Sequence, residues 1–309
     1  MPEWLIERGI GETRAALVED GRIVEARIVP EGVIPAGTVL EARLKSVGRN
    51  AIATADGGEY LLPKGAAGIT QGAKLNIEVT RELLGGGEPW KRAMARATAQ
   101  ESRLAPALHG REAQDWEFDE RDWLDLIDEA RTGLVKFSGG ELRVSLTPAM
   151  TLIDVDGHLP PAELAVAGAR AVAEAVRRHG IGGSIGIDLP TVESRAARLA
   201  AAEAVDAVLP SPFERTAVNG FGFLQIIRPR THASLFELAA DVAPFEARAL
   251  LRLAAREVGA IRLAAHPAVV AELSGNPGWL DQLSRRTGGL VTLRDDPSLA
   301  MSAGYVEPV

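Results

Sequence analysis

The sequence has no cysteine, only two tyrosines, and no long run of uncharged apolar residues. Without cysteine, disulfides and thiolate metal sites are excluded, which fits a reducing cytoplasm. No stretch of about 18 apolar residues could span a bilayer. The first residues show no basic segment followed by an apolar run, so we expect a cytoplasmic protein with no membrane partner. Any metal ion would need oxygen ligands or one of the five histidines.

The composition is that of a globular chain, with 46% apolar and 25% charged residues over 309 positions. That length predicts two or three domains. The net charge of −8 argues against an acidic partner, but the charge is unevenly distributed. Nine acids accompany three arginines in 111–131, whereas five basic residues accompany three acids in 81–103. Local basic surfaces bind phosphates even in acidic proteins, although ordinary solvated charge explains each segment equally well.

Local patterns divide the chain into five regions of a multidomain α+β and α/β protein. We expect an N-terminal β-hairpin segment packed on the catalytic part, an OB-fold barrel, an acidic helical connector, an α/β domain and a small C-terminal α/β domain. In that order, the predicted ranges are 1–35, 36–97, 98–133, 134–239 and 240–309.

Individual elements follow from turn and capping signals. Asp20-Gly21 between two β-rich runs predicts the N-terminal hairpin. Pro161 predicts the start of a helix that ends near His179. We also expect Thr191 to cap a helix reaching about Val208, and Pro244 to lead a helix to Val258.

Two apolar strands each end in an acid, T-L-I-D-V-D-G at 151–157 and S-I-G-I-D-L-P at 184–190. A carboxylate within such a run costs several kcal/mol unless it is paired or binds a metal. The intervening helix makes the strands parallel and adjacent, so Asp154 and Asp188 meet near the edge where α/β folds bind ligands. Asp156 shares the face of Asp154. This oxygen set suits Mg²⁺ or Mn²⁺ and phosphate chemistry, while the alternative is acids that cap helices or form turns.

A third feature is a glycine-aromatic turn that leads into a strand and then two arginines, V-N-G-F-G-F-L-Q-I-I-R-P-R at 218–230. Phe221 could stack on a base, and Arg228 and Arg230 could hold phosphate. Strand packing with solvated charge explains the same pattern. No G-x-S-x-G nucleophile elbow occurs and no cysteine nucleophile exists, so the sequence offers no hydrolase triad of that kind.

Taken in order, these segments resemble the ribonuclease E/G family. The likeness rests on Gly139-Gly140 with I-D-V-D-G at 153–157, on I-G-I-D at 185–188, and on N-G-F-G-F-L-Q-I-I-R-P-R at 219–230. G-E-T-R at 11–14 and T-Q-G at 70–72 are similar to the family's opening hairpin and RNA-binding barrel. The resemblance covers most of the chain and is densest over 134–236.

The resemblance implies a Mg²⁺-dependent endoribonuclease with an RNA-binding barrel and a catalytic domain like those of RNase H and DNase I. Asp154 and Asp188 match the family's metal-binding aspartates. Asp156 stands where the family usually has asparagine, and it would add either a third metal ligand or only more negative charge. Water held by the metal would attack single-stranded RNA, leaving a 3′-hydroxyl and a 5′-phosphate. The expected RNA contacts are Tyr60, Lys91, Arg92, Phe221, Arg228 and Arg230.

The chain also departs from the family pattern. The cysteines of the zinc link between subunits are absent, so we expect no zinc, and any homo-oligomer would lack that link. The 5′-end sensor has no counterpart, and Gly220 replaces the arginine before Phe-Gly. These losses favour an alternative, a catalytically inactive RNA-binding or scaffold protein that keeps the fold. A hydrolase of another phosphate ester is a third hypothesis.

Overall fold

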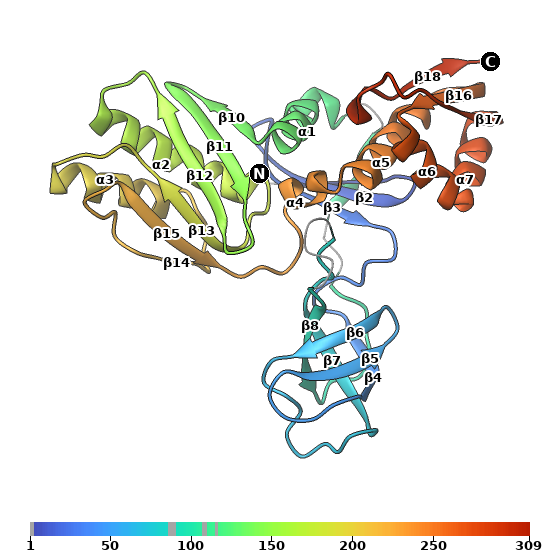
Figure 1. Cartoon of the computed structure of the whole chain (residues 1–309), viewed down its shortest axis with the longest axis horizontal. Coiled ribbons are helices and arrows are strands. Elements are labelled where there is room, and N and C mark those ends of the chain that lie inside the picture. The colour runs from blue at the N-terminus through green and yellow to red at the C-terminus, as the bar shows by residue number, and fades with distance from the viewer. Residues whose placement is uncertain (1–2, 86–90, 107–109, 115–116) are drawn as a thin grey trace.

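The computed structural model describes residues 3–85, 91–106, 110–114 and 117–309. It is a mixed α/β structure containing three open sheets and a closed barrel. In Figure 1 the barrel lies below a wide upper body, with a six-stranded sheet at one end of the body and a small C-terminal unit at the other. In this part of the chain, no helix combines the length and the apolar character needed to cross a membrane.

The strands of the first sheet come from two parts of the chain, one before and one after the barrel strands in the sequence. Its strands are β1 (Glu3–Arg8), β2 (Glu12–Glu19), β3 (Arg22–Pro30) and β9 (Gly110–Glu112), in the order β3-β2-β1-β9. The predicted hairpin is confirmed: Asp20 and Gly21 connect β2 to β3 with positive φ angles of 48° and 80°. An Asp-Gly pair adopts that conformation readily, which is why it marks tight hairpins.

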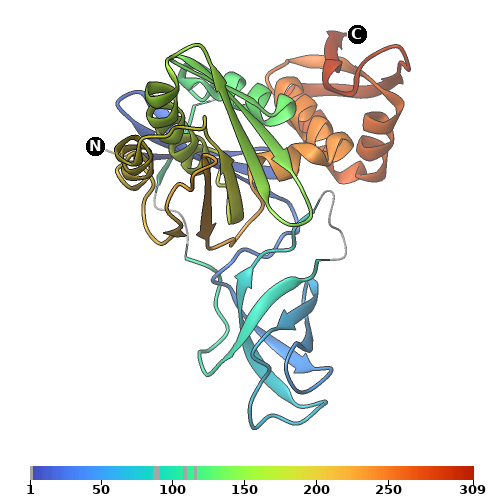
Figure 2. The ribbon, with the colours of Figure 1, turned by 60° about the vertical axis from the view of Figure 1, so that its left-hand side comes forward.

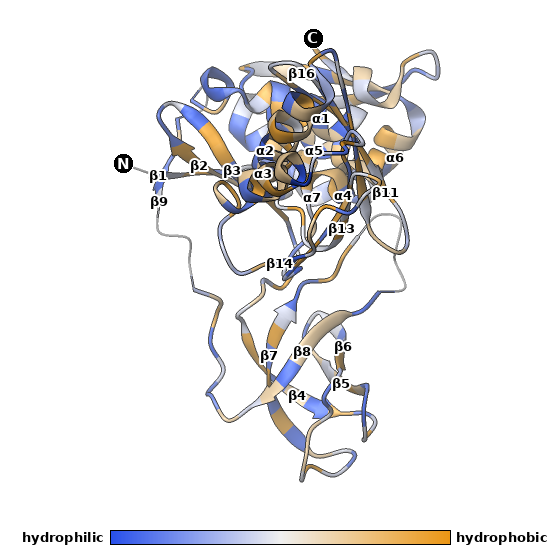
Figure 3. Cartoon of the chain, turned by 90° about the vertical axis from the view of Figure 1, so that its left-hand side faces the viewer, coloured by the Kyte–Doolittle hydropathy of each residue, from blue (hydrophilic) through white to orange (hydrophobic). Residues whose placement is uncertain are grey.

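The barrel comprises five strands, β4 (Val39–Leu44), β5 (Ala51–Ala55), β6 (Gly58–Leu62), β7 (Lys74–Arg81) and β8 (Ala93–Thr98). They close in the order β4-β5-β6-β8-β7, and β7 pairs back onto β4. Alternate residues fill the interior, so polar and apolar bands alternate along the strands in Figure 3. This architecture is compatible with the OB-like barrel that the sequence predicts.

A short neck, formed by Arg27, Ala36, Glu82 and Thr231, ties the barrel to the body. The carboxylate of Glu82 accepts hydrogen bonds from the Arg27 guanidinium and from the Ala36 amide, and the Glu82 amide donates to the Thr231 carbonyl at 2.8 Å. Glu82 is only 3% exposed, and this burial raises its pKa despite the Arg27 charge. The start of the β7–β8 connection, at Glu82, is therefore held to the body, and the segment that enters the barrel, at Ala36, is bonded to it.

The predicted helical connector over 98–133 is only partly correct. Helical structure is limited to η1 (Asp119–Arg121) and α1 (Trp123–Thr132), while 107–109 and 115–116 lie outside the described residues. Arg103 instead exchanges two backbone hydrogen bonds with Val39, which keeps that stretch extended along the barrel. Helix α1 forms because its apolar side chains recur at helical spacing and pack into the main core.

The six-stranded sheet carries the predicted acids. Its strands are β10 (Leu134–Phe137), β11 (Gly140–Leu146), β12 (Thr151–Gly157), β13 (Gly183–Asp188), β14 (Glu214–Arg215) and β15 (Phe223–Arg228), ordered β10-β11-β12-β13-β15-β14. Helices α2 (Pro161–Arg178) and α3 (Arg195–Asp206) lie on one face, as Figures 1 and 2 show. Helix α2 also packs against β3, so one apolar core joins this sheet to the N-terminal sheet.

Helix α3 starts later than predicted. Ser194 is its cap, since its side chain accepts a hydrogen bond from the Ala197 amide at 3.3 Å. Thr191 instead donates its hydroxyl to the Phe221 carbonyl at 3.1 Å, which fixes the loop after β13. The helix then ends at Asp206.

The C-terminal unit is a three-stranded sheet ordered β17-β16-β18 with helices around it. Helix α5 begins two residues before Pro244 and ends before Val258, because proline is tolerated in a first helical turn. Helix α4 (Leu235–Ala240), which packs into the main core, leads to this unit. The elements of the unit are α5 (Val242–Ala254), β16 (Gly259–Ala265), α6 (Pro267–Gly275), α7 (Pro277–Thr287), β17 (Gly288–Asp295), η2 (Met301–Ala303) and β18 (Tyr305–Pro308).

Buried ion pairs join the N-terminal sheet to α5. We call the set Glu7, Glu12, Arg14, Arg248 and Arg252 the N-terminal ion cluster. Arg14 contacts Glu7 and Glu12 at 2.5 Å each, Arg248 contacts Glu12 at 2.9 Å, and Arg252 contacts Glu7 at 2.8 Å. Three arginines thus face two carboxylates, and Asp119 adds a third carboxylate, 2.8 Å from Arg252 and 2.6 Å from Arg256.

Candidate metal and nucleic-acid site

Asp154 and Asp188 lie directly opposite each other on neighbouring strands. β12 and β13 are parallel, as predicted, and their register pairs Asp154 with Asp188. Neighbouring strands lie about 4.8 Å apart, so the two side chains start close together. We call these two residues the acid pair. The helical crossover α2 explains this register, because it returns the chain beside β12 in the same direction.

The acid pair lies on the open face of the sheet, and the prediction that the carboxylates are buried among apolar side chains is wrong. Ile153 and Val155 face the helices and are buried, whereas Asp154 and Asp156 are exposed between them. Asp188 is exposed at the end of β13. The expected shared face of Asp154 and Asp156 is confirmed, because strand side chains alternate between faces.

The electrostatics of this face are dominated by negative charge. Desolvation, followed by the charges of Asp156 and Asp188, raises the pKa of the Asp154 carboxyl above its usual value. Arg143 is the cross-strand neighbour of Asp154 on β11, but its guanidinium binds Glu141 at 2.5 Å and is 4.0 Å from Asp156. Among the residues that the structure describes, no ion pair joins a cationic side chain to Asp154 or Asp188, as expected of a cation-binding site.

The donor set of the acid pair fits Mg²⁺ or Mn²⁺. Both cations prefer carboxylate oxygens, and Mg²⁺ is commonly held by one or two carboxylates with water and substrate phosphate completing its shell. Within the described ranges, no three His, Asp or Glu side chains form a metal-binding group, and the role of Asp156 as a further ligand stays a prediction. A bound cation would offset the repulsion that raises the pKa of Asp154.

An aromatic turn borders the acid pair. Phe223 is the cross-strand partner of Asp188, and Phe221, two residues earlier, is 83% exposed. The side-chain oxygen of Asn219 accepts hydrogen bonds from the amides of both phenylalanines, at 2.9 and 3.0 Å. Gly222 has a φ of 90°, and a Cβ there would lie 2.1 Å from the Leu189 carbonyl oxygen. The exposure of Phe221 thus comes from a fixed turn, and its ring is available for stacking.

Arg228 is not placed to bind a substrate phosphate. It shares the helix-facing side of β15 with Leu224 and Ile226, and its guanidinium donates to the carbonyls of Val176 and Ile181 at 3.4 and 3.3 Å. This burial lowers its pKa. This placement argues against a contact between Arg228 and RNA, because its guanidinium is bonded to carbonyls at the end of α2.

Tyr60 is also misassigned by the sequence argument. Its ring is 1% exposed inside the barrel, and its hydroxyl donates to the Asp56 carbonyl at 3.0 Å. Burial raises the pKa of this phenol. A ring in the barrel core cannot stack on a nucleobase, so Tyr60 stabilises the barrel instead.

Lys91 and Arg92 belong to a cationic surface on the outside of the barrel. Together with Arg81 they border a cavity of about 310 Å³ whose apolar part is formed by Leu61 and Met94. Arg92 contacts Glu59 at 2.9 Å, and its carbonyl accepts a hydrogen bond from Arg81 at 2.8 Å. Cations around an apolar floor suit a phosphate with its attached base.

Several residues of this site were not identified from the sequence. Arg143 faces Asp154 because β11 and β12 form a hairpin around Thr147-Pro148. Counting residues outward from this turn in both directions would have paired the two residues. Nothing in the sequence distinguishes Phe223 from an aromatic residue that only packs within a strand. Glu237, which pairs with Arg230, lies seven residues farther along the chain and had no recognisable signal.

No protein-family model matches this chain, and no curated protein matches it.

Proposed function

We propose that the protein is a Mg²⁺-dependent endoribonuclease that hydrolyses single-stranded RNA. The observation that carries this proposal is the register of β12 and β13, which sets Asp154 against Asp188 on an open face with an exposed aromatic turn beside it. Two adjacent carboxylates on a solvent-accessible surface form an oxygen site for a hard divalent cation. Such cations serve phosphate chemistry most often.

In this proposal the carboxylates of Asp154 and Asp188 would hold the cation, and the chemistry supplied there would be activation of a water and neutralisation of charge on the phosphate. Phe221 stacks on a base next to the cleaved bond and orients the strand. Water adds to phosphorus as the bond to the 3′ oxygen breaks, so the products carry a 3′-hydroxyl and a 5′-phosphate. The cationic surface at Lys91 and Arg92 binds the RNA backbone through its charge.

The test is cleavage of an end-labelled, unstructured RNA with Mg²⁺. We expect Asp154→Asn and Asp188→Asn each to lower the cleavage rate by about a hundredfold or more, the scale of losing one active-site electrostatic group. Asp281→Asn makes the same change on an exposed residue of α7 and should leave the rate unaltered. Wild-type activity in the Asp188→Asn variant, or with the divalent ion chelated, would refute the proposal.

A second candidate is RNA binding without cleavage. It is favoured by the lack of a three-acid metal group among the described residues and by the core position of Tyr60. It predicts salt-sensitive RNA binding in a protein that yields no product with Mg²⁺ or Mn²⁺. The same assay, run with binding and cleavage readouts in parallel, separates the two functions.

A further inference from the structure

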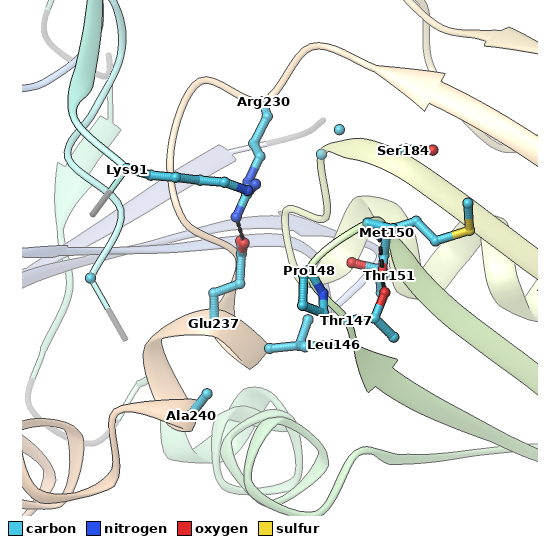
Figure 4. A pocket seen from close by; sticks show the side chains of 14 residues that line it. Lys91, Leu146, Thr147, Pro148, Met150, Thr151, Ser184, Arg230, Glu237 and Ala240 are labelled. Atoms are coloured by element: carbon cyan, nitrogen blue, oxygen red, sulfur yellow. Dashed lines mark hydrogen bonds and ion pairs between the residues drawn. The ribbon is translucent and has the colours of Figure 1, made fainter. Parts of the chain in front are cut away.

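A second cavity, of about 310 Å³, lies where β12 and β13 begin. Figure 4 shows that its side chains come from separate parts of the chain: Lys91 near the barrel, Arg230 after β15, Glu237 and Ala240 on α4, and the turn between β11 and β12. We call it the Lys91–Arg230 cavity. Its volume is at the lower end of the range for small-ligand pockets.

Two cationic side chains from distant positions meet in this cavity. In Figure 4 the ends of Lys91 and Arg230 approach each other, and Glu237 forms an ion pair with Arg230. Glu237 is itself fixed, because its other carboxylate oxygen accepts from the amide and hydroxyl of Ser234 at 2.7 and 2.8 Å. Arg230 is therefore held in position before any ligand arrives, and the three charged groups sum to one positive charge.

The walls of the cavity combine apolar and hydroxyl groups. Leu146, Pro148 and Ala240 supply apolar surface, and Thr147, Thr151 and Ser184 supply hydroxyls. A ligand with an anionic end and a flat, weakly polar body would pair with the two cations and pack against the apolar wall. A nucleotide has this chemistry, since its phosphate pairs with cations and its base packs against apolar or stacked surfaces.

The cavity is a short distance from the acid pair along the same strands. Ser184 lines the cavity and lies four residues before Asp188 on the same face of β13, whereas Thr151, three residues before Asp154, lines the cavity from the helix-facing side of β12. At about 3.3 Å per residue, the separation is roughly 10–13 Å. Stacked nucleotides rise about 3.4 Å each, so three or four of them cover that length.

We propose that the Lys91–Arg230 cavity binds one nucleotide, with its phosphate between the two cations and its base against Leu146 and Pro148. When that nucleotide belongs to an RNA strand, the phosphodiester three or four nucleotides away reaches the acid pair. This second part rests on the proposed function, whereas binding of the nucleotide does not. The cavity then sets the shortest RNA that the acid pair can use efficiently.

The test measures binding without cleavage, in buffer containing a chelator. The probes are inorganic phosphate, 5′-AMP, a trinucleotide and an octanucleotide of unstructured RNA. We expect 5′-AMP to bind more tightly than phosphate, and the octanucleotide more tightly than the trinucleotide. Lys91→Gln should weaken binding of 5′-AMP by about tenfold, the loss expected for one charge-assisted contact.

Two further variants keep the result interpretable. Ala240→Phe places a ring in the cavity from an exposed position on α4, so it should block 5′-AMP without harming the fold. Lys74→Gln removes the same charge from an exposed lysine of β7 that lies outside the cavity, and it should bind as the wild type does. Circular dichroism of each variant verifies folding.

The outcomes separate the parts of the proposal. Equal binding of phosphate and 5′-AMP, or wild-type affinity in both Lys91→Gln and Ala240→Phe, would overturn it. If 5′-AMP binds as tightly as the octanucleotide, the ligand is a free nucleotide. The inference that the cavity sets the shortest usable RNA is then wrong. Because no divalent ion is present, a protein that fails to cleave RNA can still pass this test, so failure of the proposed function is recognised separately.

Discussion

Two groups of carboxylates in this molecule experience opposite electrostatic environments. Glu7, in the N-terminal ion cluster, is partly desolvated, which acts to raise its pKa, but the hydrogen bonds and charges of Arg252 and Arg14 outweigh this and lower it. Asp154, in the acid pair, is also partly desolvated, and Asp156 and Asp188 raise its pKa further. Desolvation raises the pKa of both carboxyl groups, so the charges of the neighbouring side chains decide whether the pKa ends above or below its ordinary value.

The difference separates a structural role from a functional one. The N-terminal ion cluster is complete within the chain, since each of its carboxylates has guanidinium partners at hydrogen-bond distance. The acid pair is less complete, because the negative charges of Asp156 and Asp188 act on Asp154 more strongly than the positive charge of Arg143 does. A charge imbalance that the fold itself does not resolve is typical of a site completed by a ligand.

The largest effect is expected in the ion cluster. Arg252→Met leaves Glu7 and Asp119 without their shared partner in a site where Arg252 is 7% exposed, so we expect a loss of about 3–5 kcal/mol in the free energy of unfolding. Urea unfolding measures it. The control, Arg8→Met, removes an exposed ion pair with Glu112 and should cost under about 1 kcal/mol. Equal losses of unfolding free energy in both variants would mean that the buried ion pairs contribute no more stability than an exposed one.

A divalent ion should act only on the acid pair. At Mg²⁺ tenfold above its dissociation constant, we expect wild-type protein to gain about 1.4 kcal/mol in unfolding free energy, seen as a higher Tm. Asp188→Asn should lose most of this gain, and Asp281→Asn should retain it. Runs at matched ionic strength exclude general salt effects. The same gain in all three proteins would place the ion elsewhere.

The smallest effect concerns pH. The folded-state pKa of Glu7 is lowered, so its stabilising contribution is present above the ordinary glutamate pKa and is lost as pH falls through the folded value. The folded-state pKa of Asp154 is raised, so its contribution is fullest below the ordinary aspartate pKa and is lost as pH rises through the folded value. The free energy of unfolding is measured against pH for wild type, Glu7→Gln and Asp154→Asn. The difference between wild type and each variant should change with pH in opposite directions for the two variants in mildly acidic solution. Slopes of one sign would contradict the assignment.

Much of the fold could be predicted because local chemistry determines it. Asp20-Gly21 specifies a turn and Pro161 a helix start, and both act within a few residues. Thr191 and Ser194 are equally good caps by composition. The choice between them is made by the Phe221 carbonyl, a contact 30 residues away that a local pattern does not contain.

The site was predictable in part for a similar reason. The crossover helix made the pairing of Asp154 with Asp188 foreseeable. The alternation of apolar residues with acids along β12 also indicated that the acids face away from the core. Two other placements had a readable signal. Arg228 shares its strand parity with Leu224 and Ile226, and Tyr60 shares its parity with Leu62, so each pointed toward the apolar side.

The placement of β1 to β3 has a consequence for how the chain is made. The apolar side chains of this sheet, such as Leu5 and Ile28, are buried against a core that includes α2, which is completed about 150 residues after β3. At synthesis speeds of 5–20 residues per second, the nascent segment waits roughly ten to thirty seconds for its packing partner. During that time Leu5, Ile28 and the other apolar side chains that this sheet buries in the shared core lack the cover that α2 later provides.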